Sequence, residues 1–374
     1  MKTIGTITFH ESINYGGILQ AYALQKTLEG MGYVPEIIDY CNPDRGTAAL
    51  SGFRRVLHRV WHGVVVKILV GTDRRKNTDE FRRKYLRLSP RKYCDEKSLH
   101  ADPPVYDAYI TGSDQVWNPR NNNGDASYFL TFAPEGKKRI SYAASFGVAE
   151  IPGGVGTVYA QWLKQIHRLS VREIEGARLV NELTKTEAEM VLDPTLLLDR
   201  DQWRRVAVPC AHPRPYILCY YMPGDRLVNK SITALARQVA DRTGWRVISI
   251  GEKEYMRLNP FRCSIFNAGP AEFVGLFQNA SFVITNSFHG AAFSINYRIP
   301  FVVPINRALS PYKALSSRIT TLLQTLNLEE RLVPAGECFS REVAIDLDYR
   351  PVESILEQWR GRSLDFLRDA LESP

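Results

Sequence analysis

Short apolar stretches with the period of β-strands alternate along the chain with longer stretches of helical period. Residues 3–9 are predicted as a strand, 16–32 as an amphipathic helix that ends at a glycine, and 34–40 as the next strand. Further strands are predicted at 106–111, 139–147 and 169–173, with a helix over 158–169. Because strands that alternate with helices form parallel sheets covered by helices, the pattern predicts an α/β fold.

The alternation divides into two doubly wound, Rossmann-like domains. The proline-rich stretch "PCAHPRP" reads as a linker, so we place the N-terminal domain at 1–204 and the second domain at 205–350. The last stretch, 351–374, is predicted as a helix that returns to the first domain. In the second domain strands are predicted at 216–222, 245–251, 281–286 and 300–305, and helices at 229–244, 270–280, 290–298 and 316–328. Two such sheets facing each other leave a cleft at the carboxyl ends of their strands, where ligands usually bind.

Composition narrows the class of protein. The chain has 374 residues, 44% of them hydrophobic, which is enough for two cores. No apolar run reaches the roughly 18 to 20 residues of a membrane span, and the first residues lack the regions of a signal peptide, so we expect a cytoplasmic protein. The six cysteines have neither C-x-x-C nor Cys/His spacing, which predicts reduced thiols without a zinc site or a disulfide framework.

The positive charge of the chain is concentrated in one segment. The formal net charge is +8, and residues 53–92 hold thirteen Lys and Arg against three Asp and Glu. Apolar residues recur there at helical spacing, opposite basic residues that include Arg54, Arg55 and Arg59, so we predict a basic helical insertion at 53–92. It either contacts an anionic membrane surface or packs its apolar stripe on the domain with a solvated basic face. Nucleic-acid binding is not expected, because no recognised motif accompanies the charge.

Two loops of the first domain carry candidate site residues. Asn14, Tyr15, Gly16 and Gly17 lead into the first predicted helix, where free N–H groups would bind an anion or an acceptor; the alternative is a tight turn that needs glycine. "GSDQVWN" follows the strand at 106–111. In that loop Ser113 and Asp114 would hold or deprotonate a hydroxyl, and Trp117 would offer a face to a sugar ring; the alternative is a capping Asp beside a core Trp.

Two further stretches carry candidate anion ligands. Arg172 ends the predicted strand in "LSVRE" and would grip a carboxylate or phosphate with its planar guanidinium, unless it only faces solvent beside Glu173. In "TNSFHG" we predict that Ser287, His289 and the N–H groups of Gly290 and Ala291 surround an anion at a helix start; the alternative is a capping or core histidine.

Several well-known catalytic motifs are absent from the sequence, among them the P-loop, the G-x-S-x-G elbow and H-E-x-x-H. The stretches "NYGGILQAYALQ", "GSDQVWN", "YAASFG", "SVRE", "DPTLLL" and "SFHGAAFSI" occur in this order. Together they resemble the polysaccharide pyruvyl transferase family, from about Phe9 to about Leu323.

This resemblance implies a GT-B-like fold, in which two Rossmann-like domains face each other across a cleft. It implies transfer of the pyruvyl unit of phosphoenolpyruvate onto two hydroxyls of a sugar in a cell-surface polysaccharide precursor, closing a cyclic ketal and releasing phosphate. The histidine matching His289 and an arginine matching Arg172 would serve phosphoenolpyruvate. Asp114 would act on the acceptor hydroxyl. Phosphoenolpyruvate is then a co-substrate, and no cofactor or metal is needed.

The sequence departs from the family pattern at one position. Several pyruvyl transferases have an arginine two residues before the histidine, where this chain has Ser287. An anion contact must then come from elsewhere, and Arg318 and Lys313 are the nearest cationic candidates in the same domain.

The resemblance also bears on the partners of the enzyme. Family acceptors include sugars on polyprenyl diphosphate lipids, so the basic segment would bring the enzyme to the inner face of the cell membrane. Two alternatives stay open at this point: a GT-B glycosyltransferase that uses a nucleotide-sugar donor, and a module that binds or assembles glycans without catalysis.

Overall fold

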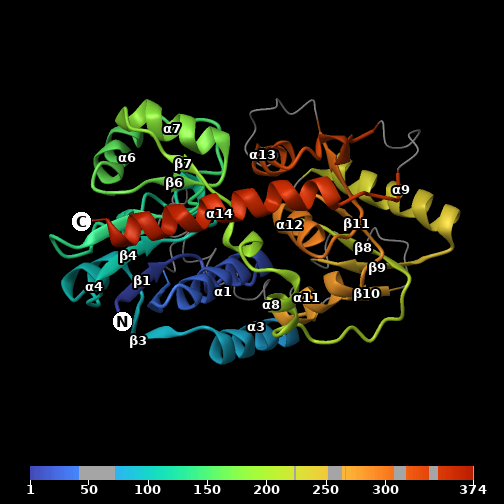
Figure 1. Ribbon diagram of the computed structural model, residues 1–374, viewed down its shortest axis with the longest axis horizontal. Coiled ribbons are helices and arrows are strands. Elements are labelled where there is room, and N and C mark those ends of the chain that lie inside the picture. Colours follow the sequence, from blue (N-terminus) through green and yellow to red (C-terminus); the bar gives the residue numbers. More distant parts are fainter. Residues whose placement is uncertain are drawn as a thin grey trace, which may run out of the picture.

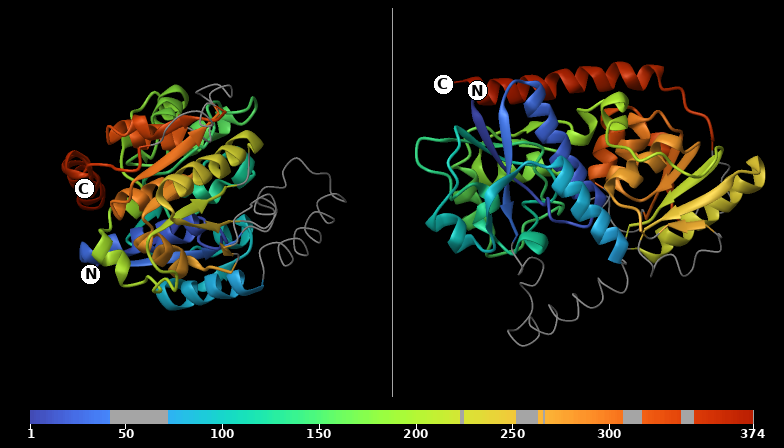
Figure 2. Two further views of the ribbon diagram at one scale, coloured as in Figure 1. Left: turned by 90° about the vertical axis from the view of Figure 1, so that its right-hand side faces the viewer. Right: turned by 90° about the horizontal axis from the view of Figure 1, so that it is seen from below.

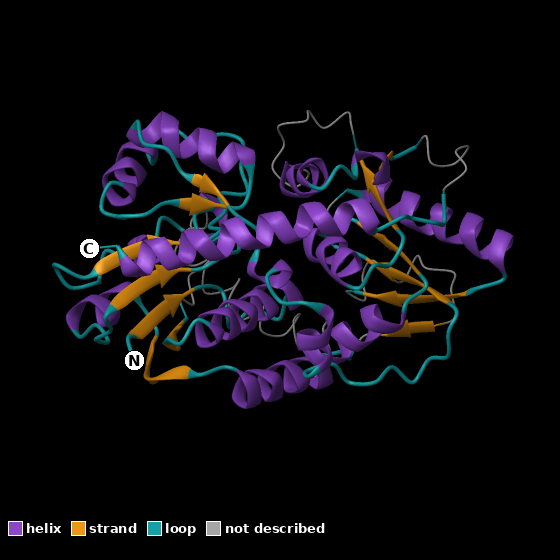
Figure 3. Cartoon of the chain, viewed as in Figure 1, coloured by secondary structure: helices purple, strands orange, loops and turns teal. Residues whose placement is uncertain are grey.

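Two parallel β-sheets lie side by side in the computed structural model, each flanked by helices (Figures 1 and 3). The structure describes residues 1–41, 72–222, 225–251, 263–265, 267–306, 317–336 and 344–373. Both sheets pair their strands in parallel throughout the described part, and the strand orders are those of Rossmann-like domains. The α/β class and the GT-B-like arrangement predicted from the sequence are therefore confirmed.

The first sheet contains the N-terminal strand at its centre. Its order is β3-β2-β1-β4-β5. The bounds are β1 Thr3–Ile7, β2 Val34–Tyr40, β3 Leu88–Tyr93, β4 Ala108–Thr111 and β5 Lys138–Ser141. Beyond β5, the short strands β6 (Ser170–Val171) and β7 (Glu189–Met190) form a pair of their own.

Backbone bridges extend the first sheet toward β6. Asp114 pairs with Ala144, and Ala144 pairs with Val171, both in parallel. These bridges place the residue after β4 beside the residue after β6. Asp114 and Arg172, which are 58 positions apart in sequence, are therefore brought to one edge of the sheet.

The second sheet repeats the same plan with one more strand. Its order is β10-β9-β8-β11-β12-β13. The bounds are β8 Tyr216–Tyr220, β9 Arg246–Ile250, β10 Cys263–Ile265, β11 Phe282–Thr285, β12 Phe301–Ile305 and β13 Leu332–Pro334. The buried centre of this sheet is built by β8 and β11, whose residues are all buried, as expected for strands covered on both faces.

Helices cover both sheets. In the first half they are α1 Tyr15–Gly30, α3 Thr72–Tyr85, α4 Glu96–Ala101, α5 Pro119–Asn122, α6 Gly156–Leu163, α7 Ile174–Thr184 and α8 Arg200–Arg204. In the second half they are α9 Arg226–Thr243, α11 Pro270–Asn279, α12 Phe288–Asn296, α13 Ser317–Thr325 and α14 Arg350–Glu372. Short 3₁₀ turns are η1 Ala126–Phe129, η2 Pro194–Leu196 and η3 Glu329–Arg331. No helix in the described ranges is both long and apolar enough to cross a membrane.

The predicted basic insertion differs from the structure at its end. Residues 88–93 are not helical but form β3, the edge strand of the first sheet. Pro90 and the exposed Arg91 and Lys92 suit an edge, because proline and charged residues prevent pairing with a further strand. Residues 42–71, with Arg54, Arg55 and Arg59, lie outside the described residues.

The last helix connects the two halves of the molecule. α14 starts beside the second sheet and runs along the first (Figures 1 and 2). Lys138 of β5 donates to the carbonyl of Leu371 over 3.2 Å, and the amide of Leu192 donates to the Ser363 hydroxyl over 3.0 Å. The helix thus holds the segment between β7 and η2 in place, which matters for the site below.

Aromatic side chains pack across the boundary between the sheets. The ring of Tyr15, on α1, stacks on Phe273 of α11 at a centroid distance of 4.4 Å. Trp203 of α8 meets Phe293 of α12 at 4.9 Å. All four belong to one apolar core that includes residues of both sheets, so the two halves are packed against each other rather than only tethered.

Candidate active site

Charged side chains from both halves meet at the carboxyl ends of the two sheets. Asp114 follows β4, Arg172 follows β6, and Asp193 lies between β7 and η2. From the second half come His289, in the first turn of α12, and Arg318, in the first turn of α13. We call these five residues the interdomain cluster.

Arg172 is the centre of the interdomain cluster. Its Nη1 donates to Asp193 Oδ2 over 2.8 Å, and its Nη2 lies 3.7 Å from Asp114 Oδ1. The guanidinium carbon sits 4.5 Å from the centre of the Phe288 ring, a cation–π contact between the two halves. Burial opposes the charge of Arg172, but Asp193 and Asp114 outweigh it and raise the Arg172 pKa. Arg172 therefore remains a cation in a place closed to water.

His289 lies between the two halves and touches the start of α1. A Cβ built on Gly16 would lie 2.0 Å from His289 Nδ1, so the imidazole rests where only glycine leaves room. On the other side, His289 Nε2 lies 3.8 Å from Asp193 Oδ2. Burial lowers the His289 pKa, Asp193 opposes this, and Arg172 adds to it. The imidazole is thus neutral near pH 7 in the ligand-free protein.

Arg318 brings a second buried guanidinium to the interdomain cluster. The Gln115 amide lies 3.2 and 3.3 Å from its two terminal nitrogens and, with its oxygen turned toward them, accepts from both. Burial and then the charge of Arg172 lower the Arg318 pKa to about 10. The surroundings therefore compensate the charge of Arg318 only in part.

Polar atoms without hydrogen-bond partners gather in this cluster. Within the described part of the chain, Nε and Nη2 of Arg172, Nε of Arg318 and Nε2 of His289 are buried and find no hydrogen-bond partner. An unpaired buried donor costs free energy, and such donors persist where a ligand supplies the acceptor. Since guanidinium groups bind carboxylates and phosphates, the arrangement favours an anionic ligand.

Asp114 is the carboxylate of the cluster with the most exposure. Its side chain is 13% exposed, whereas that of Asp193 is fully buried. Its backbone is held at φ 78°, a left-handed conformation that costs energy for a residue other than glycine and often marks a functional site. Gly17 lies beside this carboxylate: a Cβ there would lie 2.9 Å from the Phe9 carbonyl oxygen and 3.4 Å from Asp114 Oδ2. Asp114 is thus more accessible to solvent than Asp193, and its predicted role on an acceptor hydroxyl stays a prediction.

Two predicted acceptor ligands are core residues instead. Trp117 is fully buried, stacks on Phe129 at 5.6 Å and donates from its indole N–H to the Tyr128 carbonyl. Tyr15 is buried against Phe273, and its hydroxyl donates to the Ala268 carbonyl over 2.9 Å. The predictions of a sugar-stacking face at Trp117 and an acceptor contact at Tyr15 are wrong, because packing uses both rings.

The helix start at α12 is also used differently from the prediction. Ser287 is the N-cap: its hydroxyl accepts from the Gly290 N–H over 3.4 Å, and its carbonyl accepts from the Ala291 N–H. These two N–H groups are therefore not free for an anion, and the prediction that they bind one is wrong. Gly290 is required by packing, since a Cβ would lie 2.4 Å from the Thr285 hydroxyl.

Two other predicted residues, Asn14 and Ser113, have structural partners. Asn14 caps α1 by accepting from the Gly16 N–H over 3.0 Å. The Ser113 hydroxyl is fully buried and donates to Asp193 over 2.7 Å, so it orients that carboxylate. Lys313 lies outside the described residues. Roles of Asn14 and Gly17 in acceptor binding stay predictions.

Sequence reasoning did not assign a role to two buried carboxylates. Asp193 accepts from Arg172, Ser113 and Thr195, and these charges and donors, together with His289, hold the Asp193 pKa at about 2 despite its burial. Glu173 accepts from the Ser145 hydroxyl and from two backbone N–H groups, and burial raises its pKa. The acidic residues in "DPTLLL" and "SVRE", motifs already noticed, were the available signal.

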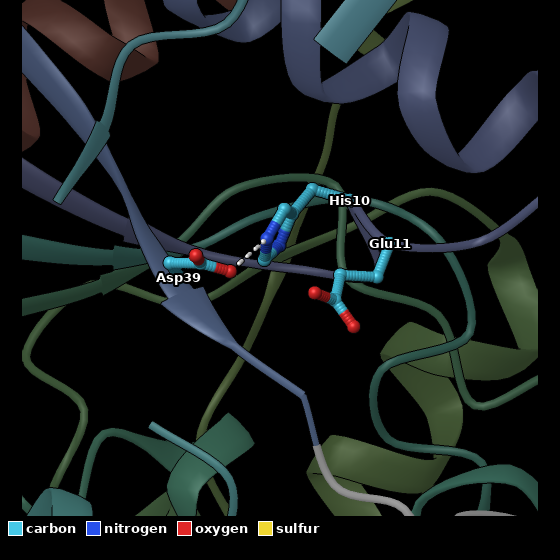
Figure 4. A group of neighbouring side chains, drawn as sticks. All are labelled: His10, Glu11 and Asp39. Carbon is cyan, nitrogen blue, oxygen red and sulfur yellow. Dashed lines mark hydrogen bonds and ion pairs between the residues drawn. The ribbon is translucent and has the colours of Figure 1, made fainter. Parts of the chain in front are cut away.

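A second histidine–carboxylate group lies after β1 (Figure 4). His10, Glu11 and Asp39 offer ligand atoms within 4.8 Å of one another, which is a spacing that a metal ion could bridge. However, Glu11 already pairs with Lys92, and Asp39 lies near Arg82. These positive charges oppose a further cation, so we assign this group a structural role and name it the β1 cluster.

Comparisons with known proteins agree with this picture. Residues 14–307 match the family profile described as polysaccharide pyruvyl transferase. No curated protein matches the chain in sequence.

Several solved structures have a similar chain fold at low sequence identity. Methanocaldococcus jannaschii UDP-GlcNAc 2-epimerase, in complex with UDP-GlcNAc and UDP, is 12% identical with a TM-score of 0.46 over 95% of this chain and 98% of that one. S. aureus MnaA with UDP is 12% identical with a TM-score of 0.48 over 97% of both chains. E. coli heptosyltransferase WaaC with ADP is 10% identical with a TM-score of 0.42 over 96% and 99%. At such identities a likeness concerns the chain fold alone.

Proposed function

Because the chain belongs to the polysaccharide pyruvyl transferase family, we propose that it transfers the pyruvyl unit of phosphoenolpyruvate onto two hydroxyls of a sugar in a cell-surface polysaccharide precursor. The observation that carries the proposal is the set of unpartnered donors in the interdomain cluster, on Arg172, Arg318 and His289 among the described residues. Phosphoenolpyruvate has a carboxylate and a phosphate, and two guanidinium groups suit these two anionic groups.

In this proposal the two arginines hold the donor. Arg318 supplies the contact that an arginine at position 287 would otherwise give, since the side chain of Ser287 caps α12. Burial and then the charge of Arg172 lower the pKa of Arg318. The negative charge of the donor would offset both effects, so binding of an anion is favoured.

The reaction moves protons between named groups. The methylene carbon of phosphoenolpyruvate takes one proton, positive character develops at the neighbouring carbon, and a sugar hydroxyl attacks there. The bond to the phosphate oxygen breaks, a second hydroxyl closes the ketal, and phosphate leaves with the other proton. Asp114 accepts a hydroxyl proton. His289, neutral in the free protein, gains affinity for a proton when the anionic donor binds, and then supplies it or holds the phosphate.

The basic residues of α3 suggest a second part of the proposal, a contact with the membrane. On α3 the side chains of Arg75, Lys76, Arg83 and Lys84 are exposed. Arg74, in contrast, is buried with its guanidinium 4.3 Å from the centre of the Tyr15 ring, so it serves packing. We propose that the exposed residues contact an anionic membrane that carries a polyprenyl diphosphate-linked acceptor. Changing Arg83 and Lys84 to Glu should reduce co-sedimentation with anionic liposomes; unchanged sedimentation would remove the membrane contact from the proposal.

The test of the transferase activity uses phosphoenolpyruvate with a panel of hexose and N-acetylhexosamine glycosides. We expect release of inorganic phosphate that depends on an acceptor, together with a product whose mass increases by one pyruvyl ketal. Arg318→Met should abolish both, whereas Lys92→Ala, which removes the ion-pair partner of Glu11 in the β1 cluster, should leave both unchanged. Release of a nucleoside diphosphate from a nucleotide sugar, with no reaction of phosphoenolpyruvate, would replace this proposal with a glycosyltransferase.

A further inference from the structure

Asp193 lies next to one candidate donor-binding residue from each half of the protein, Arg172 from the first half and His289 from the second. Its Oδ2 accepts from Arg172 Nη1 over 2.8 Å and lies 3.8 Å from His289 Nε2. From this geometry we propose that Asp193 is a positioning residue, which fixes the guanidinium of Arg172 and the imidazole of His289 relative to each other. The importance of this role for catalysis rests on the proposed function, but the role itself is measurable without any substrate.

The carboxylate of Asp193 has little freedom to move. Oδ1 accepts from the Thr195 N–H over 2.9 Å and from the Thr195 hydroxyl over 2.6 Å. Oδ2 also accepts from the Ser113 hydroxyl over 2.7 Å. Each oxygen thus has two hydrogen bonds, and the carboxylate plane is set by Thr195, Ser113 and Arg172, which lie on three different segments. A side chain held in this way orients its neighbours instead of following them.

The backbone around Asp193, in the first half, is held by two helices of the second half, α12 and α14. The Thr195 carbonyl accepts from the Asn296 amide of α12 over 2.6 Å. The Leu196 carbonyl accepts from Arg360 of α14 over 2.6 Å, and Leu192 is bonded to Ser363 of the same helix. His289 lies near the start of α12, the helix that carries Asn296. A fixed connection therefore runs from α12 through the Asp193 segment to Arg172.

The charges around His289 show what Asp193 does to its proton. The groups that act on the imidazole are Asp193, Arg172, Asp114 and Arg318, two carboxylates and two guanidinium groups. Asp193 is the larger of the two attractive influences, and it opposes the burial that disfavours an imidazolium. Without the charge of Asp193, the two arginines would dominate and His289 would bind a proton less readily.

Glu173 provides a matched control. It is also buried beside Arg172, with Oε2 4.0 Å from Arg172 Nε. Its other oxygen accepts from Ser145, and the largest influences on the His289 pKa are burial, Asp193, Arg172, Asp114 and Arg318 rather than Glu173. Replacing Glu173 by Gln therefore removes a buried carboxylate next to the interdomain cluster and leaves in place Asp193, the carboxylate 3.8 Å from the imidazole.

The experiment compares Asp193→Asn with Glu173→Gln in the intact protein. The titration of the His289 ring protons is followed by NMR and assigned by its loss in His289→Gln. We expect the midpoint for His289 to move to lower pH in Asp193→Asn and to stay at the wild-type value in Glu173→Gln. A folded Asp193→Asn protein with the wild-type midpoint, or an equal movement in Glu173→Gln, would overturn the proposal. Because no phosphoenolpyruvate is present, this result is independent of the proposed reaction.

Kinetic measurements then distinguish the effect of the position of the Asp193 carboxylate from the effect of its charge. In Asp193→Asn we expect kcat/KM for phosphoenolpyruvate to fall on the order of 100-fold, with the acidic limb of its pH profile moved in the same direction as the NMR midpoint. Asp193→Glu keeps the charge but displaces it, so the midpoint should return toward the wild-type value while kcat/KM stays low. Full recovery of kcat/KM in Asp193→Glu would show that position does not matter, which contradicts the proposal.

A milder variant covers the case in which Asp193→Asn does not fold. Thr195→Val removes one hydroxyl bond to Oδ1 and leaves every charge in place. We expect a higher KM for phosphoenolpyruvate with an unchanged His289 midpoint, because the carboxylate loses a restraint but keeps its charge. Wild-type KM and kcat in Thr195→Val would contradict a positioning role.

Discussion

The interdomain cluster and the β1 cluster are built from the same kinds of residue, yet they differ in how far their polar atoms are satisfied. In both, a histidine after a parallel strand faces a carboxylate: His10 Nε2 lies 3.2 Å from Asp39, and His289 Nε2 lies 3.8 Å from Asp193. His10 uses its second nitrogen on the Thr8 carbonyl. In the interdomain cluster, four buried nitrogen atoms lack a hydrogen-bond partner among the residues that the structure describes.

The difference shows how a structural histidine can be distinguished from one at a site. Each position after a strand looks the same in sequence, and both groups are largely buried. What separates them is that the β1 cluster pairs its charges within one domain, whereas the interdomain cluster leaves guanidinium and imidazole nitrogens without a hydrogen-bond partner among the described residues. Native proteins rarely keep such groups unless a ligand completes them.

The largest difference between the two clusters should appear when Arg172, the central cation of the interdomain cluster, is removed. Arg172→Ala leaves Asp193 and Asp114 buried without their partner, so we expect the free energy of unfolding to fall by about 3 to 5 kcal/mol. Pyruvyl transfer should be lost as well. Urea denaturation measures the first effect and phosphate release the second. A stable Arg172→Ala protein would mean that the ion pairs of the interdomain cluster are weak.

Adding a methyl group near the start of α1 should affect the reaction, whereas adding one at its end should not. Gly16→Ala places a Cβ against the His289 ring, while a Cβ at Gly30, on the same helix, meets nothing within 4 Å. We expect Gly16→Ala to lower phosphate release on the order of 100-fold by displacing the imidazole, and Gly30→Ala to leave it unchanged. Equal rates in the two variants would show that the position of His289 is not important for the reaction.

Low pH should lower the stability of the folded protein through the interdomain cluster. The Asp193 pKa is about 2 in the folded protein against an ordinary value of 3.8, so its stabilising contribution is complete above that ordinary value and is lost as the pH falls toward 2. This loss is on the order of 2 kcal/mol. His289 works in the same direction, because its lowered pKa makes the folded state less stable below pH 6.5. Unfolding measured between about pH 5 and pH 2 should therefore depend less on pH in Asp193→Asn, and parallel curves would contradict the assignment.

The smallest effect is expected in the β1 cluster. The Lys92 side chain is 49% exposed in its pair with Glu11, so Lys92→Ala should change the free energy of unfolding by less than about 1 kcal/mol. The same denaturation assay measures it. A loss as large as that of Arg172→Ala would show that the β1 cluster is as critical as the interdomain cluster.

The sequence predicted the fold and part of the site, for reasons that particular residues make clear. The alternation of strands and helices could be read from local patterns. For Arg172 and His289 the local pattern left structural alternatives open, and only the family resemblance assigned both to one site. The predicted use of Trp117 and of the Gly290 N–H could not be decided locally, because it depends on whether Phe129 and Ser287 already occupy those groups. Asp193 was missed because its importance comes from contacts with residues 80, 21 and 96 positions away along the chain.

The edge strand β3 was missed for a similar reason. Its basic residues resemble the helix that precedes them, and only pairing with β2 makes 88–93 extended. Local composition therefore extended the helix prediction too far.

The central claim is that the incompletely compensated charge of the interdomain cluster exists to bind phosphoenolpyruvate, and melting of wild-type protein and Arg318→Met with and without this ligand tests it most directly. Since burial and Arg172 disfavour the charge of Arg318, the variant without ligand should melt at the wild-type temperature or above it. Phosphoenolpyruvate should raise the melting temperature of the wild type and leave that of Arg318→Met unchanged. An equal rise in both proteins, or a rise only with UDP-, GDP- or CMP-sugars, would contradict the claim.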